Sequence, residues 1–260
     1  MLQYIITHFS SFFPQLSAVL GSGFLIFVRV LGFMRFCPGL QRSELPKNTK
    51  IGFAVMFTIF LIGILKPPAP PADASLVFGI IINYVFGALL GFIGFCIVNA
   101  VEAGGDMMNT QMGMSSATVL DPTTSGQVSL MGKLLGLVGL LIFINIGGIY
   151  WMLNAFIRSF ELFPIYGTAI PFDKFLNLEY LTTITSNILY IGLQFASPIL
   201  IATLGQDIIL GIISKTAPQI NVFQLSFLFK PLMGALILYL VMPVLMGIIN
   251  DYFMSYANIF

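Results

Sequence analysis

Six long apolar segments divide this sequence, and each is bounded by proline, glycine or charge. They cover about residues 14–37, 51–65, 76–101, 134–157, 184–213 and 231–259. A helix that spans the hydrocarbon core of a membrane needs about 20 apolar residues, so only the second segment is short. In lipid each backbone N–H must find a partner within its own segment, which favours helices over such uninterrupted lengths. The pattern predicts an all-α membrane-type protein with about six long hydrophobic helices.

The composition agrees with a membrane environment. Hydrophobic residues make up 58% of the 260 residues and charged residues only 8%, against roughly 25% charged in an ordinary soluble domain. With 11 basic and 10 acidic residues the chain is almost neutral, and nothing in that balance attracts a nucleic acid. We therefore expect a membrane as partner and no nucleic acid.

Glycines recur at helical spacing in two of the segments. Gly87, Gly91 and Gly94 lie on one face of the third segment, and Gly132 and Gly136 lie four residues apart at the start of the fourth. Small residues at such spacing let two helix backbones approach closely inside a membrane. The alternative is that glycine is simply frequent in membrane helices.

The stretch 102–132 interrupts the apolar pattern and is rich in Gly, Ser, Thr and Met. Long connections inside compact proteins are uncommon and often functional. Methionine is flexible and polarizable, which suits a segment that fills an irregular gap and later reopens. The residues of interest are Gly104, Gly105, Met107, Met108, Met112, Gly113, Met114, Asp121 and Pro122. An ordinary surface loop is the alternative interpretation.

Enzyme chemistry finds no support in the sequence. The single histidine, His8, stands near the N-terminus, and there is no phosphate-binding loop, no paired metal ligands and no nucleophile beside a base. We expect no enzyme activity, no cofactor and no metal site. Charges inside or beside the apolar segments, such as Arg29 and Asp207, are costly there. In a secondary transporter, Glu102, Asp106 or Asp207 would form a proton or ion relay. The alternative is that these acidic residues pair with arginines or lie at helix ends inside an assembly.

Several motifs resemble the FliR/SctT family of type III protein-export gates. The match covers nearly all of the chain, in order, and its tail motif is the most specific part. The residues that carry it are Arg29, Arg35, Pro38, Leu45-Pro46, Lys50, Ala103-Gly104, Gln111-Met112-Gly113, Ala117-Thr118, Asp121-Pro122, Ser159-Phe160, Pro164, 217–223, Leu225, Phe227 and Lys230-Pro231.

The tail carries a second resemblance, to the small two-helix FliQ subunit, through Ser197-Pro198-Ile199-Leu200, Gly211, 218–221, 225–227 and Lys230. The resemblance implies two parts, a FliP-like helical part over 1–180 that contains the loop 102–132, and a FliQ-like helical hairpin over 181–260. In such an assembly the apolar helices pack largely against partner subunits, so apolar surface is not by itself lipid contact.

The family implies a structural and gating subunit of the flagellar export apparatus, in the bacterial inner membrane at the flagellar basal body. FliP-like and FliQ-like subunits would form the pore with it, unfolded export substrates would pass through, and the loop 102–132 would plug the channel. A polar turn, with Lys230 starting the next helix, would dock an FlhB-like switch protein. That partner interface comprises Pro218, Gln219, Asn221, Phe223 and Lys230. A secondary transporter for a small solute and the equivalent injectisome subunit remain the alternatives.

Overall fold

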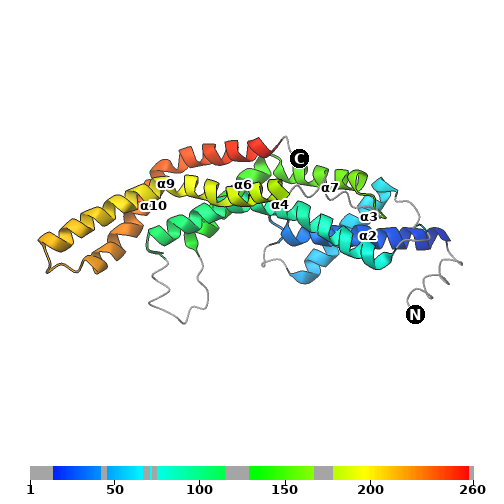
Figure 1. Ribbon diagram of the computed structural model, residues 1–260, viewed down its shortest axis with the longest axis horizontal. Helices are drawn as coiled ribbons and strands as arrows, with labels where there is room; N and C mark the ends of the chain where they lie inside the picture. The colour runs from blue at the N-terminus through cyan, green and yellow to red at the C-terminus, as the bar shows by residue number, and fades with distance from the viewer. Residues whose placement is uncertain are drawn as a thin grey trace. The chain divides into compact units, whose positions relative to one another are not determined.

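The computed structural model describes residues 14–41, 46–66, 71, 75–114, 129–166 and 178–257, and all their side chains except those of 14–20 and 178–180. Every regular element in these ranges is a helix, which confirms the predicted all-α class. The helices are α2 (Pro14–Phe36), α3 (Lys47–Leu65), α4 (Leu76–Gln111), α6 (Leu130–Asn145), α7 (Gly148–Leu162), α9 (Leu178–Thr216) and α10 (Val222–Tyr256), as Figure 1 shows.

These helices form two compact units. The first comprises Met1–Phe95 and Ile149–Leu178, so it contains α2, α3, α7 and the first half of α4. The second comprises Cys96–Gly148 and Glu179–Ile259, which is the second half of α4 with α6, α9 and α10. These units describe packing, whereas the FliP-like and FliQ-like parts are a division by resemblance, and that division stays a prediction.

In the first unit, helix α2 is the central element. It packs along α3, and its aromatic side chains reach α7, where the rings of Phe33 and Phe156 lie 4.7 Å apart. Helix α4 approaches α2 so closely that a Cβ added to Gly87 would collide with the carbonyl oxygen of Arg29. A Cβ on Gly91 would likewise collide with the carbonyl oxygen of Phe33. Only glycine permits this backbone contact.

The predicted fourth segment is wrong as a single helix. The chain breaks between α6, which ends at Asn145, and α7, which begins at Gly148. Gly147 adopts φ +85° at the break, a left-handed conformation that glycine adopts at no steric cost. Hydropathy continues unchanged across the break, so the apolar pattern gave no sign of it.

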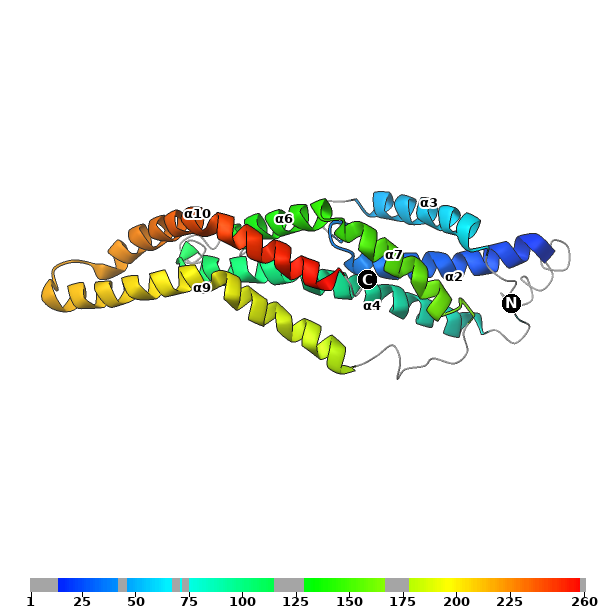
Figure 2. The same cartoon turned by 90° about the horizontal axis from the view of Figure 1, so that it is seen from above.

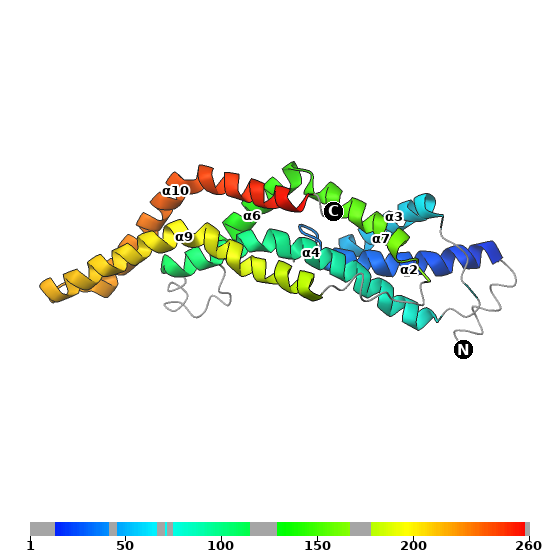
Figure 3. The ribbon, with the colours of Figure 1, turned by 45° about the horizontal axis from the view of Figure 1, so that its top comes forward.

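In the second unit, α9 and α10 form a long hairpin whose two helices run side by side in Figures 1 and 2. Pro198 lies inside α9, and Pro231 and Pro243 lie inside α10. Both helices bend along their length in Figure 3, as proline inside a helix predicts. Pro198 leaves the carbonyl of Gln194 without its helical donor, and the hydroxyl of Ser197 donates to that oxygen at 2.8 Å.

Candidate functional site

The expected loop 102–132 is shorter in the structure than the sequence indicated. Helix α4 continues to Gln111, so Gly104, Gly105, Met107 and Met108 are helical residues. The helix ends on Gly113, which has φ +74° and donates its N–H to the carbonyl of Thr110 at 3.1 Å. A left-handed glycine directly after a helix is a frequent helix stop. Asp121 and Pro122 lie outside the described residues.

The two adjacent glycines of α4, Gly104 and Gly105, lie at contacts with neighbouring helices. A Cβ on Gly104 would lie 2.9 Å from the carbonyl oxygen of Gly192 on α9. A Cβ on Gly105 would lie 2.6 Å from the carbonyl oxygen of Met131 on α6. Both distances are too short for any real Cβ, so α4 is packed against both neighbours where the loop leaves it.

The beginning of α6 is fixed to the end of α4 by polar contacts. The Ser129 hydroxyl oxygen caps α6 by accepting the N–H of Gly132 at 2.9 Å. The N–H of Met131 points at the side-chain oxygen of Asn109 on α4, 3.5 Å away. The side chain of Asp106 lies against Gly132 at a position that a Cβ would occupy. These contacts, with the glycine contacts of α4, define the loop base, from which the chain leaves at residue 114 and returns at residue 129.

The methionines divide into two groups. Met108 and Met112 are fully buried, and the side chain of Met112 occupies the space beside Gly234 of α10. Met107 and Met114 are half-buried. Met107 also lines an open cavity of about 430 Å³ together with Asp106, Thr110, Leu193 and Leu200. Met108 and Met112 therefore anchor the loop base, whereas the sequence indicated a segment that fills a gap and later reopens.

Three more of the glycines singled out from the sequence lie at side chains. A Cβ on Gly94 would collide with the side chain of Met152 within the first unit. In the second unit, a Cβ on Gly136 would lie 3.0 Å from Oε2 of Glu102, and one on Gly132 would collide with Asp106. A methionine side chain can move to relieve a clash more easily than backbone can. A larger residue at Gly94 should therefore be tolerated better than one at Gly87 or Gly91.

The turn between α9 and α10 has the polar character expected of it. Pro218, Gln219 and Asn221 are exposed, and the N–H of Ile220 donates to the carbonyl of Ala217 at 3.0 Å. Asn221 caps α10 because its side-chain oxygen accepts the N–H of Gln224 at 3.2 Å. Phe223 is 73% exposed, so this end of the hairpin presents a large aromatic ring next to the polar turn.

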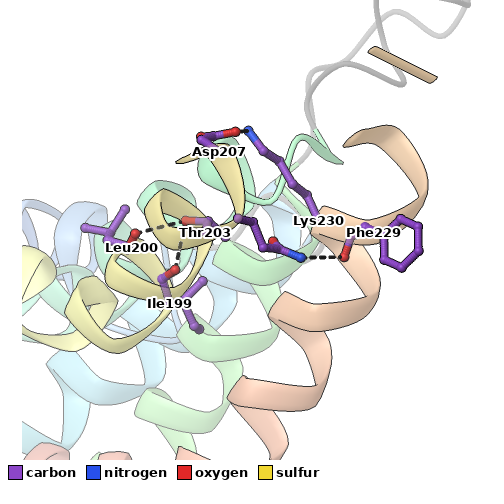
Figure 4. A network of polar contacts seen from close by, with 7 residues as sticks. Ile199, Leu200, Thr203, Asp207, Phe229 and Lys230 are labelled. Carbon is purple, nitrogen blue, oxygen red and sulfur yellow. Dashed lines mark hydrogen bonds and ion pairs between the residues drawn. The ribbon is translucent and has the colours of Figure 1, made fainter. Parts of the chain in front are cut away.

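Lys230 was expected to start a helix, but α10 already begins at Val222. Its ammonium nitrogen lies 2.6 Å from a carboxylate oxygen of Asp207 on α9, and further polar contacts, of Thr203 and at the carbonyl of Phe229, lie beside the pair (Figure 4). Gln206 donates to the carbonyl of Phe229 at 3.3 Å. The charge of Asp207 is thus paired within the hairpin, although with a lysine and not with an arginine as expected.

Arg29 forms the most deeply buried polar cluster of the first unit. Its guanidinium is fully buried and donates to the side-chain oxygen of Asn83 at 2.9 Å. It also donates to the carbonyls of Ser159 and Phe163 at 3.1 and 2.9 Å, and it lies 4.2 Å from the ring centre of Phe160. Those carbonyls belong to the last turn of α7 and the residue after it, where the helix dipole favours a cation. The sequence showed the isolated charge but not its partners.

Within the described ranges, no group of three or more His, Cys, Asp or Glu side chains is placed as metal ligands would be. The polar groups instead cap helices, pair across the hairpin or hold the loop base.

The described helices place the chain among all-α membrane-type proteins whose helices meet through glycines. Four of them are long and apolar enough to cross a membrane, or five if the bent pair α6 and α7 counts as one span. The chain belongs to the bacterial export proteins, family 1, whose family model matches residues 20–256.

Individual relatives agree with this family assignment. The chain is 27% identical over 238 residues to the flagellar biosynthetic protein FliR of Escherichia coli (strain K12), a match that covers 89% of this chain and 88% of the relative. It is 27% identical over 237 residues to FliR of Bacillus subtilis (strain 168), covering 88% and 89%. The surface presentation of antigens protein SpaR of Shigella sonnei is 28% identical over 159 residues, covering 60% and 59%. The chain is therefore a membrane subunit of the flagellar or a related type III export apparatus.

Proposed function

We propose that this chain is the structural and gating subunit of a flagellar type III export apparatus in the bacterial inner membrane, with a packing role and no enzyme activity. The observation that carries the proposal is the family match over residues 20–256, which includes the loop base and the whole hairpin. The flagellar branch is favoured because the FliR relatives match almost the whole chain, whereas SpaR matches 60% of it.

The partners proposed are FliP-like and FliQ-like subunits. Large apolar side chains stand exposed along both helices of the hairpin, among them Ile201 at 72% and Leu228 at 72%. Water does not tolerate so much contiguous apolar surface, and helical subunits with apolar faces are suited to cover it. The exposed polar turn at Pro218 and Gln219, with Phe223 beside it, is the proposed contact for an FlhB-like switch protein.

The plug proposal concerns the segment between the two ends of the loop base. A resting export pore must hold back ions and still admit an unfolded chain, and an apolar obstruction can do both by excluding water. The loop base supports this role because it fixes both ends of the segment on packed helices. Met108 and Met112 are buried there, which leaves Met114 and the residues that follow it as the proposed obstruction.

The test is to replace residues 115–128 by a Gly-Ser segment of equal length. The complex should still assemble, and affinity purification through this chain should recover FliP-like and FliQ-like subunits. Membranes that contain the variant should leak small ions, as measured by the decay of a potassium gradient. A matched control replaces Pro218-Gln219 by Gly-Ser, which should leave the membrane tight. Unchanged ion permeability in a loop variant that still exports would place the segment outside the pore.

A further inference from the structure

Helix α3 exposes almost all of its surface within the unit to which it belongs. Its buried residues are Ala54, Thr58 and Leu61, which lie four and three residues apart and so form one narrow strip against α2. Most of the other large side chains point outward, including Met56, Ile59 and Phe60 at 62%, 66% and 62% exposure. The ring of Phe57 lies 6.1 Å from that of Phe156 on α7. Within the described residues, α3 therefore contacts α2 and α7 on one side and presents a wide apolar surface on the other.

The width of that exposed surface indicates what kind of partner covers it. At about 100° of rotation per residue, the exposed large residues from Ile51 to Ile64 span an arc of about 220°, and the buried strip lies in the remaining part. A helix that packs on a core through one face buries a stripe about 100° wide or somewhat wider, which is about half of that arc. The acyl chains of lipids can cover an apolar surface of any width. The wide exposed arc of α3 therefore favours lipid over a single neighbouring protein helix.

The polar groups of α3 are already satisfied as a hydrocarbon environment requires. Between Lys50 and Lys66 the sequence contains no charge, and its one polar side chain is that of Thr58. The Thr58 hydroxyl donates to the carbonyl of Ala54 at 2.7 Å. Each backbone N–H inside the helix bonds within the helix, so no polar group of this stretch needs water.

Both ends of the helix carry cations. Lys47 and Lys66 are exposed at opposite ends, while Lys50 is engaged by the carbonyl of Gln41 at 3.2 Å. The rise from Lys50 to Lys66 is about 24 Å at 1.5 Å per residue, slightly less than the hydrocarbon thickness of about 30 Å. Long lysine side chains and local thinning make up such a difference. Their charges complement anionic lipid headgroups.

The hairpin differs from α3 in each of these respects. Asp207, Lys230 and Gln206 make polar contacts among its exposed apolar residues, and α9 and α10 have 39 and 35 residues, far more than a bilayer requires. Charges at such positions are costly in lipid and acceptable beside protein.

From these observations we propose that the outer face of α3 is the lipid-contacting surface of this subunit, whereas the outer faces of the hairpin are covered by protein. The proposal goes beyond export gating, because it states which apolar surface contacts lipid and which contacts protein. It stands independently of any role for the loop.

The test uses the assembled export complex in vesicles of phosphatidylethanolamine and phosphatidylglycerol, in an otherwise cysteine-free background. A nitroxide spin label is placed at Ile59→Cys on α3 and, as the matched control, at Tyr239→Cys on α10, which is 80% exposed within this chain. Oxygen concentrates in lipid and a nickel chelate stays in water, so the two relaxation agents report which phase surrounds each label.

The label at position 59 should collide with oxygen and not with the nickel chelate, and the label at position 239 should be shielded from both. Shielding of position 59 from both agents would show a protein partner on α3 and overturn the proposal. Access of the nickel chelate to position 59, or a lipid signature at position 239, would overturn it equally. Gel filtration of the same sample reports assembly, so a failed complex and a wrong surface assignment are distinguishable.

Discussion

Replacing Arg29 by methionine removes the guanidinium while filling most of the space of its aliphatic stem. Two acceptors then lose a hydrogen bond from a charged donor. Phe163 follows the end of α7, and its carbonyl accepts from Arg29 at 2.9 Å. The side-chain oxygen of Asn83 accepts from Arg29 at 2.9 Å. The carbonyl of Ser159 is less affected, because it also accepts the N–H of Phe163.

The size of the effect follows from these two bonds. A hydrogen bond to a charged group contributes about 1.5–3 kcal/mol net, so losing both costs about 3–6 kcal/mol. This is a large share of a typical folding free energy of about 5–15 kcal/mol. At about 2–4 °C per kcal/mol for a chain of this size, the melting temperature should fall by roughly 6–24 °C.

The assay is fluorescence-detected gel filtration of the tagged complex after stepwise heating. Arg158→Met is the matched control, because Arg158 is an exposed arginine of α7 and its replacement should leave the melting temperature near that of the unmodified protein. Arg29→Lys should fall between, since lysine keeps the charge and loses the planar fork. Equal melting temperatures for Arg29→Met and Arg158→Met would refute the assignment of stability to this cluster.

Two further predictions concern buried groups. Gly87→Ala should lower the melting temperature of the complex or prevent its assembly, because the new Cβ would collide with the carbonyl of Arg29; Gly63→Ala on α3 has nothing within 4 Å and should be neutral or stabilise by up to about 1 kcal/mol. A Gly87→Ala complex as stable as Gly63→Ala would contradict the close contact of α2 and α4. Cys37 is buried, with 5% of its surface exposed, so mass spectrometry should detect alkylation of its thiol only after unfolding in detergent. Rapid labelling of the folded complex would show that Cys37 is accessible.

The sequence predicted the helical class and the approximate position of most helices because long apolar runs leave the backbone few alternatives. The prediction from sequence failed where one residue type, glycine, occurs both in loops and at close helix contacts. Gly104 and Gly105 beside Asp106 have the composition of a loop, yet the structure uses these glycines to bring α4 against α9 and α6. Local composition cannot distinguish a flexible glycine from one that permits close packing, since the difference depends on a distant partner.

The predictions made from prolines and charges were likewise partly right and partly wrong. Pro218 correctly marked the turn between the last two helices, whereas Pro231 was taken as the beginning of a helix and lies well inside α10. Asp207 and Lys230 were both recognised as costly charges or motif residues, but their pairing depends on the geometry of the hairpin. The helix break at Gly147 was missed because apolar residues continue on both sides of it.

The Arg29 cluster also imposes an order on biosynthesis. Asn83 follows Arg29 by 54 residues in the chain, and Ser159 follows it by 130. At about 5–20 residues per second, the ribosome needs roughly 7–26 seconds to deliver α7 after α2 has emerged. During that interval the guanidinium lacks its carbonyl acceptors, and a charge that is buried without partners is costly. The first unit can therefore close around Arg29 only when the end of α7 arrives.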